Sequence, residues 1–200
     1  MAAMTKTART AEAAADEAGT PIMVEAVDSL SDEELDALAA ATRDAVADGE
    51  DIAWLTPPPV EKLRAFWKGV LSAPRRQLIV GRFKGRIAAA VQLVLPGTIH
   101  EAGAHQGTIE TFFVAPFARG HGLARALLEK AEELARAQHL IVLDLSIRAD
   151  RRRAIELVER LGYRRWAEKP HYALIDGRFH TGYFYTKTLD ATPLQGKTGR

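Results

Sequence analysis

One segment of the 200-residue sequence is more informative than the rest: Val114-Ala-Pro-Phe-Ala-Arg-Gly-His-Gly-Leu-Ala-Arg-Ala-Leu-Leu128. An apolar, β-type run at 109–114 leads into a short loop with two glycines, and an amphipathic helical pattern follows directly. The first N–H groups of a helix have no partner within the helix, and the helix dipole makes that end positive. Gly120 and Gly122 allow the backbone to curl, so that several N–H groups converge on one anion. The segment therefore predicts a binding site for a phosphate-bearing cofactor.

The whole chain limits the class of protein. Its 27 Lys and Arg residues balance 26 Asp and Glu residues, which gives no general attraction to nucleic acid or to a membrane surface. Cysteine is absent, and no apolar run approaches the roughly 18 residues of a membrane-spanning helix. We expect a cytoplasmic protein with a disordered leader at 1–20, one domain at 21–190 and a tail at 191–200.

Hydrophobic periodicity predicts an α/β domain with helices on both faces of a mixed sheet of about six or seven strands. Ser31-Asp-Glu-Glu34 has the form of a capping box at a helix start, and Lys84-Gly85 is the turn of a β-hairpin. Asp150 is expected to cap a helix over 151–161. The other expected helices span 31–47, 60–71 and 122–138, and the expected strands span 22–27, 77–83, 86–94, 108–114, 140–146, 163–169 and 181–189.

Three kinds of phosphate-binding loop share this strand, glycine loop and helix. A P-loop would need Lys and Ser or Thr after the last glycine, where Leu123 and Ala124 stand. A dinucleotide fingerprint would need a small residue at Arg125, although Asp144 lies 22 residues after Gly122 and mimics the acid that binds a ribose. A dinucleotide-binding enzyme therefore stays open as an alternative, and it predicts stabilisation by NAD.

The third kind is the pattern Arg119-x-x-Gly122-x-Ala124, which resembles the acyl-CoA loop of the GNAT superfamily of N-acyltransferases. The resemblance covers about residues 22–190 and includes a later helix that ends in Glu159-Arg-Leu-Gly-Tyr163. The C-terminal segment from His171 to Lys187 resembles the branch that includes the tabtoxin-resistance acetyltransferase. This resemblance implies a mostly antiparallel sheet in which one parallel pair of strands, 108–114 and 140–146, splays apart.

The resemblance also implies where acetyl-CoA binds. The pantetheine arm would pair with the open strand edge, and the loop amides would hold the pyrophosphate. Arg151 stands near a helix start within a basic cluster, where a bound anion such as the 3′-phosphate of CoA would offset the unfavourable dipole; a solvated helix face is the alternative. The implied cofactor-binding residues are Phe112, Phe113, Val114, Arg119, Gly120, His121, Gly122, Leu123, Ala124 and Arg151.

The implied reaction transfers an acetyl group from acetyl-CoA directly to a primary amine of a small molecule or a protein. The amine must lose a proton, and Glu110 and Asp144 are the candidate bases, each with a structural role as the alternative. The N–H of Val114 would polarise the thioester carbonyl. Many relatives carry a Tyr as general acid where Val158 stands here. Water or a tyrosine of the C-terminal hairpin then becomes the candidate, Tyr172 first and Tyr183 or Tyr185 next, each with a packing role as the alternative.

The same substitution keeps a second alternative open, a non-catalytic acyl-CoA-binding or regulatory domain. The six histidines show no metal-ligand spacing, and we expect no metal. We expect no nucleic-acid or membrane partner, and a homodimer is left open.

Overall fold

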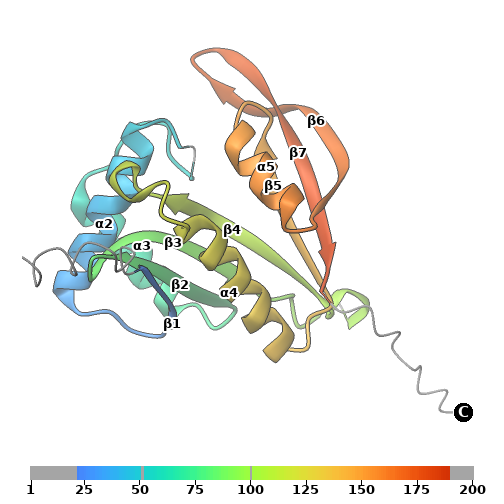
Figure 1. The fold of residues 1–200 in the computed structure, drawn as a ribbon, viewed down its shortest axis with the longest axis horizontal. Coiled ribbons are helices and arrows are strands. Elements are labelled where there is room, and N and C mark those ends of the chain that lie inside the picture. Colours follow the sequence, from blue (N-terminus) through green and yellow to red (C-terminus); the bar gives the residue numbers. More distant parts are fainter. Residues whose placement is uncertain (1–21, 51, 100, 190–200) are drawn as a thin grey trace, which may run out of the picture.

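A computed structural model describes residues 22–50, 52–99 and 101–189. The predicted leader and tail lie outside these residues. The described strands form one seven-stranded sheet in the order β1-β2-β3-β4-β5-β7-β6 (Figure 1). The strands are β1 (Ile22–Val27), β2 (Arg76–Phe83), β3 (Arg86–Val94), β4 (Gln106–Val114), β5 (Val142–Arg148), β6 (Arg164–Ile175) and β7 (Arg178–Thr188). The α-helices are α2 (Asp32–Ala47), α3 (Val60–Ser72), α4 (Leu123–Ala137) and α5 (Arg152–Arg160), and short 3-10 helices span Glu101–Gly103 and Pro116–Ala118.

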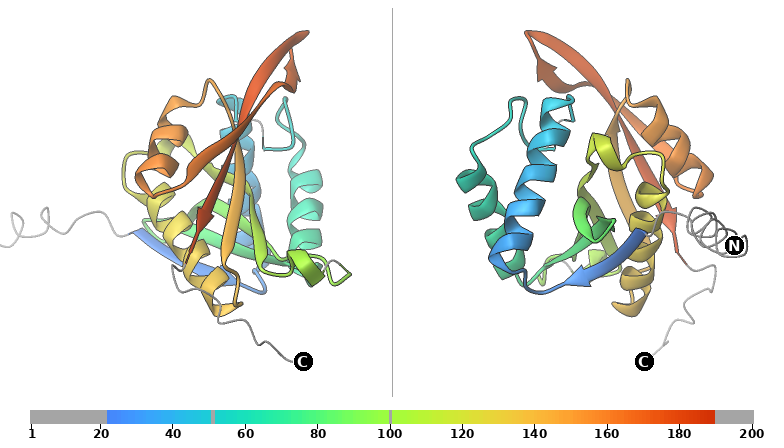
Figure 2. Two further views of the ribbon diagram at one scale, coloured as in Figure 1. Left: turned by 90° about the vertical axis from the view of Figure 1, so that its right-hand side faces the viewer. Right: turned by 60° about the vertical axis from the view of Figure 1, so that its left-hand side comes forward.

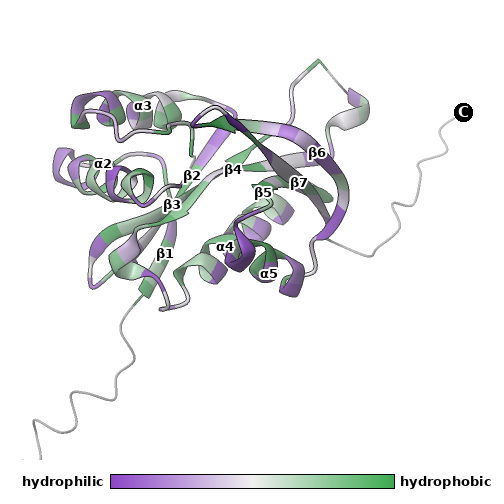
Figure 3. Ribbon diagram, turned by 90° about the horizontal axis from the view of Figure 1, so that it is seen from above, coloured by the Kyte–Doolittle hydropathy of each residue, from purple (hydrophilic) through white to green (hydrophobic). Residues whose placement is uncertain are grey.

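Helices cover both faces of the sheet, as predicted. Helices α2 and α3 lie on one face, and α4 and α5 lie on the other (Figures 2 and 3). Each face has its own apolar core, with Leu38 and Trp67 on the α2–α3 side and Leu127 and Leu143 on the α4 side. No helix of the described segments is long and apolar enough to cross a membrane.

Local signals in the sequence set several of these boundaries. The predicted capping box at α2 is confirmed: the Ser31 N–H donates to Glu34 Oε2 at 2.9 Å, and the Glu34 N–H donates to Ser31 Oγ at 3.2 Å. Lys84 and Gly85 both have positive φ angles in the tight β2–β3 turn, which is the backbone that a two-residue hairpin requires. The capping box thus begins α2, and the turn joins β2 to β3.

The parallel strands β4 and β5 pair over three residues and then separate. Their register runs from Gln106 opposite Val142 to Thr108 opposite Asp144, and no later pair joins them in the described residues. Strand β4 keeps its pairing with β3 as far as Val114 but bulges between Glu110 and Phe113. Thr111 sits in this bulge with φ of +49°, and its Oγ1 accepts a hydrogen bond from the buried Gln92 side chain at 2.8 Å. The predicted splayed pair is therefore present, with a bulge pinned at its open edge.

Two predictions from the sequence are wrong in detail. Asp150 does not cap α5; its carboxylate accepts a hydrogen bond from Arg148 Nε at 2.7 Å, and Arg151 occupies the N-cap position. Strands β6 and β7 form a longer hairpin than the periodicity indicated, because β6 continues beyond Pro170 through an irregular register between Lys169 and Ala173. The projecting hairpin is visible in Figure 1. A proline is tolerated there because β6 is the edge strand.

Candidate acyl-CoA and acceptor site

The open edge of β4 offers backbone groups to a ligand. Val114 lies opposite Ala89, and the next N–H, that of Ala115, donates to Ala88 O at 2.8 Å. Because backbone groups alternate along a strand, the N–H and C=O of Val114 point away from β3 and toward the gap beside β5. The carbonyl of Val114 accepts from Arg119 Nε at 3.1 Å. The N–H of Val114 points into the gap, where a group that polarises the carbonyl of a ligand is expected.

The loop before α4 presents a row of free amides. Gly120 and Gly122 have φ angles of +83° and +86°, and Gly122 is the left-handed N-cap of α4. Within the described residues, no acceptor receives the N–H groups of residues 120–125, whereas the Arg119 N–H donates to Pro116 O at 3.3 Å. The amides that can cradle an anion therefore begin at Gly120, one residue later than the sequence pattern suggested.

A cavity of about 370 Å³ lies over these amides. We call it the phosphate cavity, and its size suits part of a cofactor. Of the residues predicted to bind the cofactor, all but His121 and Arg151 line it. Its walls are Glu50, Phe112, Phe113, Val114, Ala118, Arg119, Gly120, Gly122, Leu123, Ala124, Arg125, Arg153, Ala154 and Leu157.

The basic side chains near this cavity differ from the prediction. Arg151 does not line the phosphate cavity; it lines a second cavity, described below. Arg125 and Arg153 are the exposed cations that line the phosphate cavity. His121 is exposed, and its ring stacks on Phe83 at 4.5 Å between centroids. His121 therefore contributes its backbone to the loop, as its position in the motif indicated.

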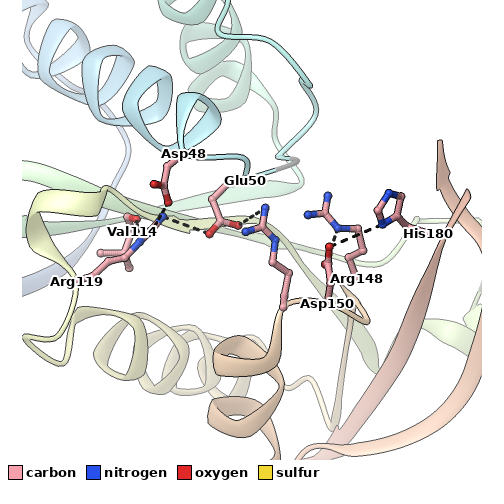
Figure 4. Close-up of polar contacts among 8 residues, drawn as sticks. Asp48, Glu50, Val114, Arg119, Arg148, Asp150 and His180 are labelled. Atoms are coloured by element: carbon pink, nitrogen blue, oxygen red, sulfur yellow. Dashed lines mark hydrogen bonds and ion pairs between the residues drawn. The ribbon is translucent and has the colours of Figure 1, made fainter. Parts of the chain in front are cut away.

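The guanidinium of Arg119 binds acceptors within the protein. It donates to the Asp48 carboxylate at 2.5 Å and to Glu50 Oε1 at 3.4 Å, in addition to the Val114 carbonyl (Figure 4). Both acids belong to the segment that follows α2. The side chain of Arg119 thus joins the loop before α4 to the α2–α3 connection.

A second cavity of about 320 Å³ adjoins the first and is lined by residues of both β4 and β5. We call it the acceptor chamber. Its walls come from the α2–α3 connection, β4, β5, α5 and β6, and they carry both charged and apolar side chains: Glu50, Ile52, Ala53, Ile109, Glu110, Thr111, Phe112, Leu145, Ser146, Ile147, Arg148, Arg151, Ala154, Val158 and Tyr172. The two cavities share Glu50, Phe112 and Ala154.

Glu110 lies in the acceptor chamber beside the bulge of β4. Its Oε2 accepts from Arg76 Nη1 at 2.8 Å, and the same nitrogen donates to Gln92 Oε1 at 2.7 Å. Gln92 in turn holds Thr111, so that the carboxylate and the bulge are fixed by one network. The Glu110 side chain is 44% exposed, which leaves it open to a substrate or a water molecule.

Tyr172 also lies in the acceptor chamber, and its hydroxyl is 2.8 Å from Ser146 Oγ on β5. The ring passes directly over Gly182 on the paired strand, where a Cβ would overlap it. The ring also meets Phe184 edge-on, with centroids 5.9 Å apart. Glycine at 182 therefore allows a tyrosine on the projecting hairpin to reach back into the chamber.

Asp144 and Val158 complete the set of predicted residues. Asp144 lies at the last paired residue of β4 and β5 and lines neither cavity, although it shares a face of β5 with Ser146. Val158 is buried in the chamber wall, so that α5 offers a methyl group at this point and no hydroxyl. Among the candidate acids and bases, the structure brings together Glu110 and Tyr172 and leaves Asp144 outside.

Arg148 lines the chamber, and its side chain belongs to a charged group with Asp150 and His180 (Figure 4). Arg148 is 9% exposed, and His180 Nδ1 lies 3.8 Å from Asp150 Oδ2. Partial burial tends to raise the pKa of the Asp150 carboxyl, but the hydrogen bond and charge of Arg148, with Arg151 and His180, hold that pKa below its ordinary value. In the described segments no group of three or more His, Asp or Glu side chains is arranged to hold a metal ion.

Comparison with known proteins agrees with this geometry. Residues 39–163 match the acetyltransferase (GNAT) family. An uncharacterized N-acetyltransferase encoded in the hisH-hisA intergenic region of Azospirillum brasilense is 47% identical over 134 residues, which cover 67% of this chain and 80% of that protein.

Solved structures share the fold. An N-acetyltransferase from Staphylococcus aureus Mu50 superposes with a TM-score of 0.73 at 18% identity, covering 86% of this chain and 100% of that one. The putative acetyltransferase yncA from Salmonella typhimurium was solved with its cofactor acetyl-CoA. It has a TM-score of 0.68 at 17% identity, and the match covers 88% of this chain and 98% of that one. With one parallel strand pair in the described sheet, the fold contradicts the dinucleotide-binding alternative, which needs a parallel doubly wound sheet. Three findings agree: the strands β4 and β5 splay apart, the amides before α4 are free, and the family match covers most of the domain. The chain therefore belongs to the acetyltransferase (GNAT) family, whose members are acetyl-CoA-dependent N-acetyltransferases.

Proposed function

We propose that the chain acetylates a primary amine, with Glu110 as the base and Tyr172 as the proton donor. The observation that carries this proposal is that both side chains line one chamber, which shares three wall residues with the cavity over the free amides. Acetyl-CoA would supply the activated acetyl group as a thioester. The residues present fit such a ligand, because unpaired amides at 120–125 suit a diphosphate and the open edge of β4 suits an amide-bearing arm.

The residues divide the chemistry between them. An amine attacks only when it is neutral, whereas a free alkylamine has a pKa of about 10.4, so a base must remove a proton. Glu110 is held by Arg76 and stays half open to the chamber, where it accepts that proton directly or through water. The Val114 N–H points into the gap and stabilises negative charge on the reacting carbonyl oxygen.

Tyr172 supplies a proton as the carbon–sulfur bond breaks. The neighbouring Ser146 hydroxyl orients the phenol, and α5 provides no hydroxyl because Val158 stands in its wall. A thiol has a pKa of about 8.5, so the thiolate leaves readily and the acid assists by a modest factor. Asp144 lies outside the chamber, and we assign it a secondary place as a base.

The test combines binding with a panel of amines. Calorimetry should show acetyl-CoA binding to the wild-type protein, and a free-thiol assay should show release of CoA with at least one amine. Glu110→Gln should lower kcat by about 100-fold while acetyl-CoA still binds. Asp144→Asn is the matched control and should lower kcat by much less.

The opposite outcomes separate the alternatives. No binding at millimolar acetyl-CoA would contradict the proposal entirely. Binding without thiol release for any amine would favour the non-catalytic acyl-CoA-binding domain, for which Val158 in place of a tyrosine is the motivating observation. A larger loss in Asp144→Asn than in Glu110→Gln would exchange their roles. The predicted acceptor stays a primary amine of a small molecule or a protein, and a homodimer stays open.

A further inference from the structure

Glu50 occupies a distinctive place at the junction of the two cavities. It lines both the phosphate cavity and the acceptor chamber, and it is the charged member of the three residues that do so. Its side chain is 27% exposed and comes from the connection between α2 and α3. The mechanism above does not use it.

The two carboxylate oxygens of Glu50 face opposite walls of the splayed gap. Oε1 lies 3.4 Å from Arg119 Nη2, on the loop that follows β4, and Oε2 lies 3.7 Å from Arg151 Nη2, at the start of α5 after β5 (Figure 4). Glu50 thus spans the opening at which β4 and β5 part.

The two arginines are bound differently. Arg119 is also fixed by Asp48 and by the Val114 carbonyl, so its position does not depend on Glu50 alone. Arg151 has Nε and Nη2 shielded from solvent without a hydrogen-bond partner in the described part of the chain. A shielded cation needs nearby opposite charge, which the carboxylate of Glu50 supplies at 3.7 Å and the charge of Asp150 supplements.

The segment that carries Glu50 also covers the acceptor chamber. Ile52 and Ala53 line the chamber from this side, and Ala53 has a φ of +84°, a conformation that alanine rarely adopts. Such a backbone persists only where surrounding contacts hold it. The Glu50 N–H donates to Ala45 O at 3.0 Å, which anchors the segment to the end of α2, and the Glu50 side chain anchors it to both walls.

We propose that Glu50 is a positioning residue that ties the cover of the acceptor chamber, Ile52 and Ala53, to Arg119 on one wall and Arg151 on the other. Because the free amides beside Arg119 bind the anionic end of the cofactor, the same contacts link filling of the phosphate cavity to the shape of the acceptor chamber. Both carboxylate oxygens of Glu50 face a guanidinium, so Glu50 acts by holding the position of its neighbours. This inference rests on the proposed function.

The experiment measures hydrogen exchange of the backbone amides at 48–54, with and without saturating acetyl-CoA. In the wild-type protein, cofactor binding should slow exchange in this segment. Glu50→Gln should abolish that effect and raise the KM of the best amine found in the panel by about tenfold, with kcat changed less than threefold. Arg151→Gln should likewise raise the KM and change kcat less than threefold. The KM of the double variant should be no higher than that of either single variant.

Asp48→Asn is the matched control, because Asp48 lies on the same segment and contacts Arg119 but has no contact with Arg151. It should keep most of the cofactor-dependent protection and the amine KM. Wild-type exchange and kinetics in Glu50→Gln, or equal effects of Asp48→Asn and Glu50→Gln, would overturn the inference. A hundredfold loss of kcat in Glu50→Gln at unchanged KM would also overturn it, since Glu50 would then act as the base. Failure of the wild-type protein to bind acetyl-CoA would instead overturn the proposed function.

Discussion

The phosphate cavity and the acceptor chamber adjoin each other but are built in different ways. The phosphate cavity depends on backbone N–H groups from one continuous segment, 120–125. The acceptor chamber depends on side chains that five separate parts of the chain bring together. A site built from backbone tolerates most side-chain changes and fails when the backbone conformation changes. A site built from side chains responds to each residue according to its own chemistry.

The largest expected effect is on the backbone-built cavity. Gly122→Val places a β-branched residue at φ of +86°, at the N-cap of α4, and should weaken acetyl-CoA binding by about 100-fold or more. Calorimetric titration with acetyl-CoA measures this loss.

A remote glycine provides the matched control for Gly122. Gly85→Val imposes a similar strain at φ of +78° in the β2–β3 turn, and a Cβ there meets no atom within 4 Å. It should lower the melting temperature and leave acetyl-CoA affinity unchanged. Equal affinity in both variants would show that the phosphate cavity does not depend on the conformation of its loop.

A second prediction concerns a side chain of the acceptor chamber. Tyr172→Phe removes the hydroxyl that lies beside Ser146 and should lower kcat by about tenfold, with little change in acetyl-CoA affinity. Gly182→Ala should lower kcat to a similar degree, because its methyl group displaces the Tyr172 ring. Steady-state thiol release measures both variants.

Tyr183→Phe is the control for this pair. Tyr183 lies on the same hairpin, but its ring stacks under the Arg165 guanidinium at 4.3 Å and does not line the chamber. It should retain wild-type kcat. A full-rate Tyr172→Phe enzyme would remove the proton donor from the mechanism and leave departure of the thiolate unassisted.

The contrast explains what the sequence could and could not predict. The glycine spacing at 120 and 122 is local, so one motif indicated the loop, the helix start and the ligand class together. The splayed pair followed from the family resemblance and the sheet with helices on both faces from hydrophobic periodicity, and both are confirmed. The capping box at Ser31 was equally local, and its two hydrogen bonds are present.

Residues that depend on tertiary position were harder to predict. Glu110 and Asp144 looked equivalent as carboxylates on neighbouring strands, and only the point at which β4 and β5 separate puts one inside the chamber. Glu50 and Ser146 carry no motif, since their partners lie far away in sequence. Arg151 at the N-cap of α5 and Arg153 in its first turn differ by two positions, and they line different cavities.

A smaller effect on acetyl-CoA affinity should distinguish Arg153 from its neighbour Arg152. Arg153→Gln should weaken acetyl-CoA binding about threefold in dilute buffer, because an exposed cation beside a phosphate contributes little and is screened by salt. Arg152→Gln removes an exposed charge that lines neither cavity and should leave the affinity unchanged. Calorimetry at low and high salt measures both, and a loss in Arg153→Gln that persists at high salt would indicate a shielded contact.

The smallest expected effect is on the free energy of unfolding, and it depends on pH. Asp150 holds Arg148 in the chamber wall, and its pKa in the folded protein lies below its ordinary value. The stabilisation is therefore complete above the unfolded-state pKa of about 3.9 and is lost as the pH falls through the lower folded-state pKa. Asp150 is about half exposed, so Asp150→Asn should lower the free energy of unfolding at pH 7 by under about 1 kcal/mol, and the difference should shrink as the pH falls below about 3.9. Urea unfolding at pH 7 and at a series of acidic pH values measures it, with Asp28→Asn as an exposed control just after β1. A deficit that does not shrink as the pH falls would mean that the carboxylate stabilises the wall through packing, since only its charge is removed by acid.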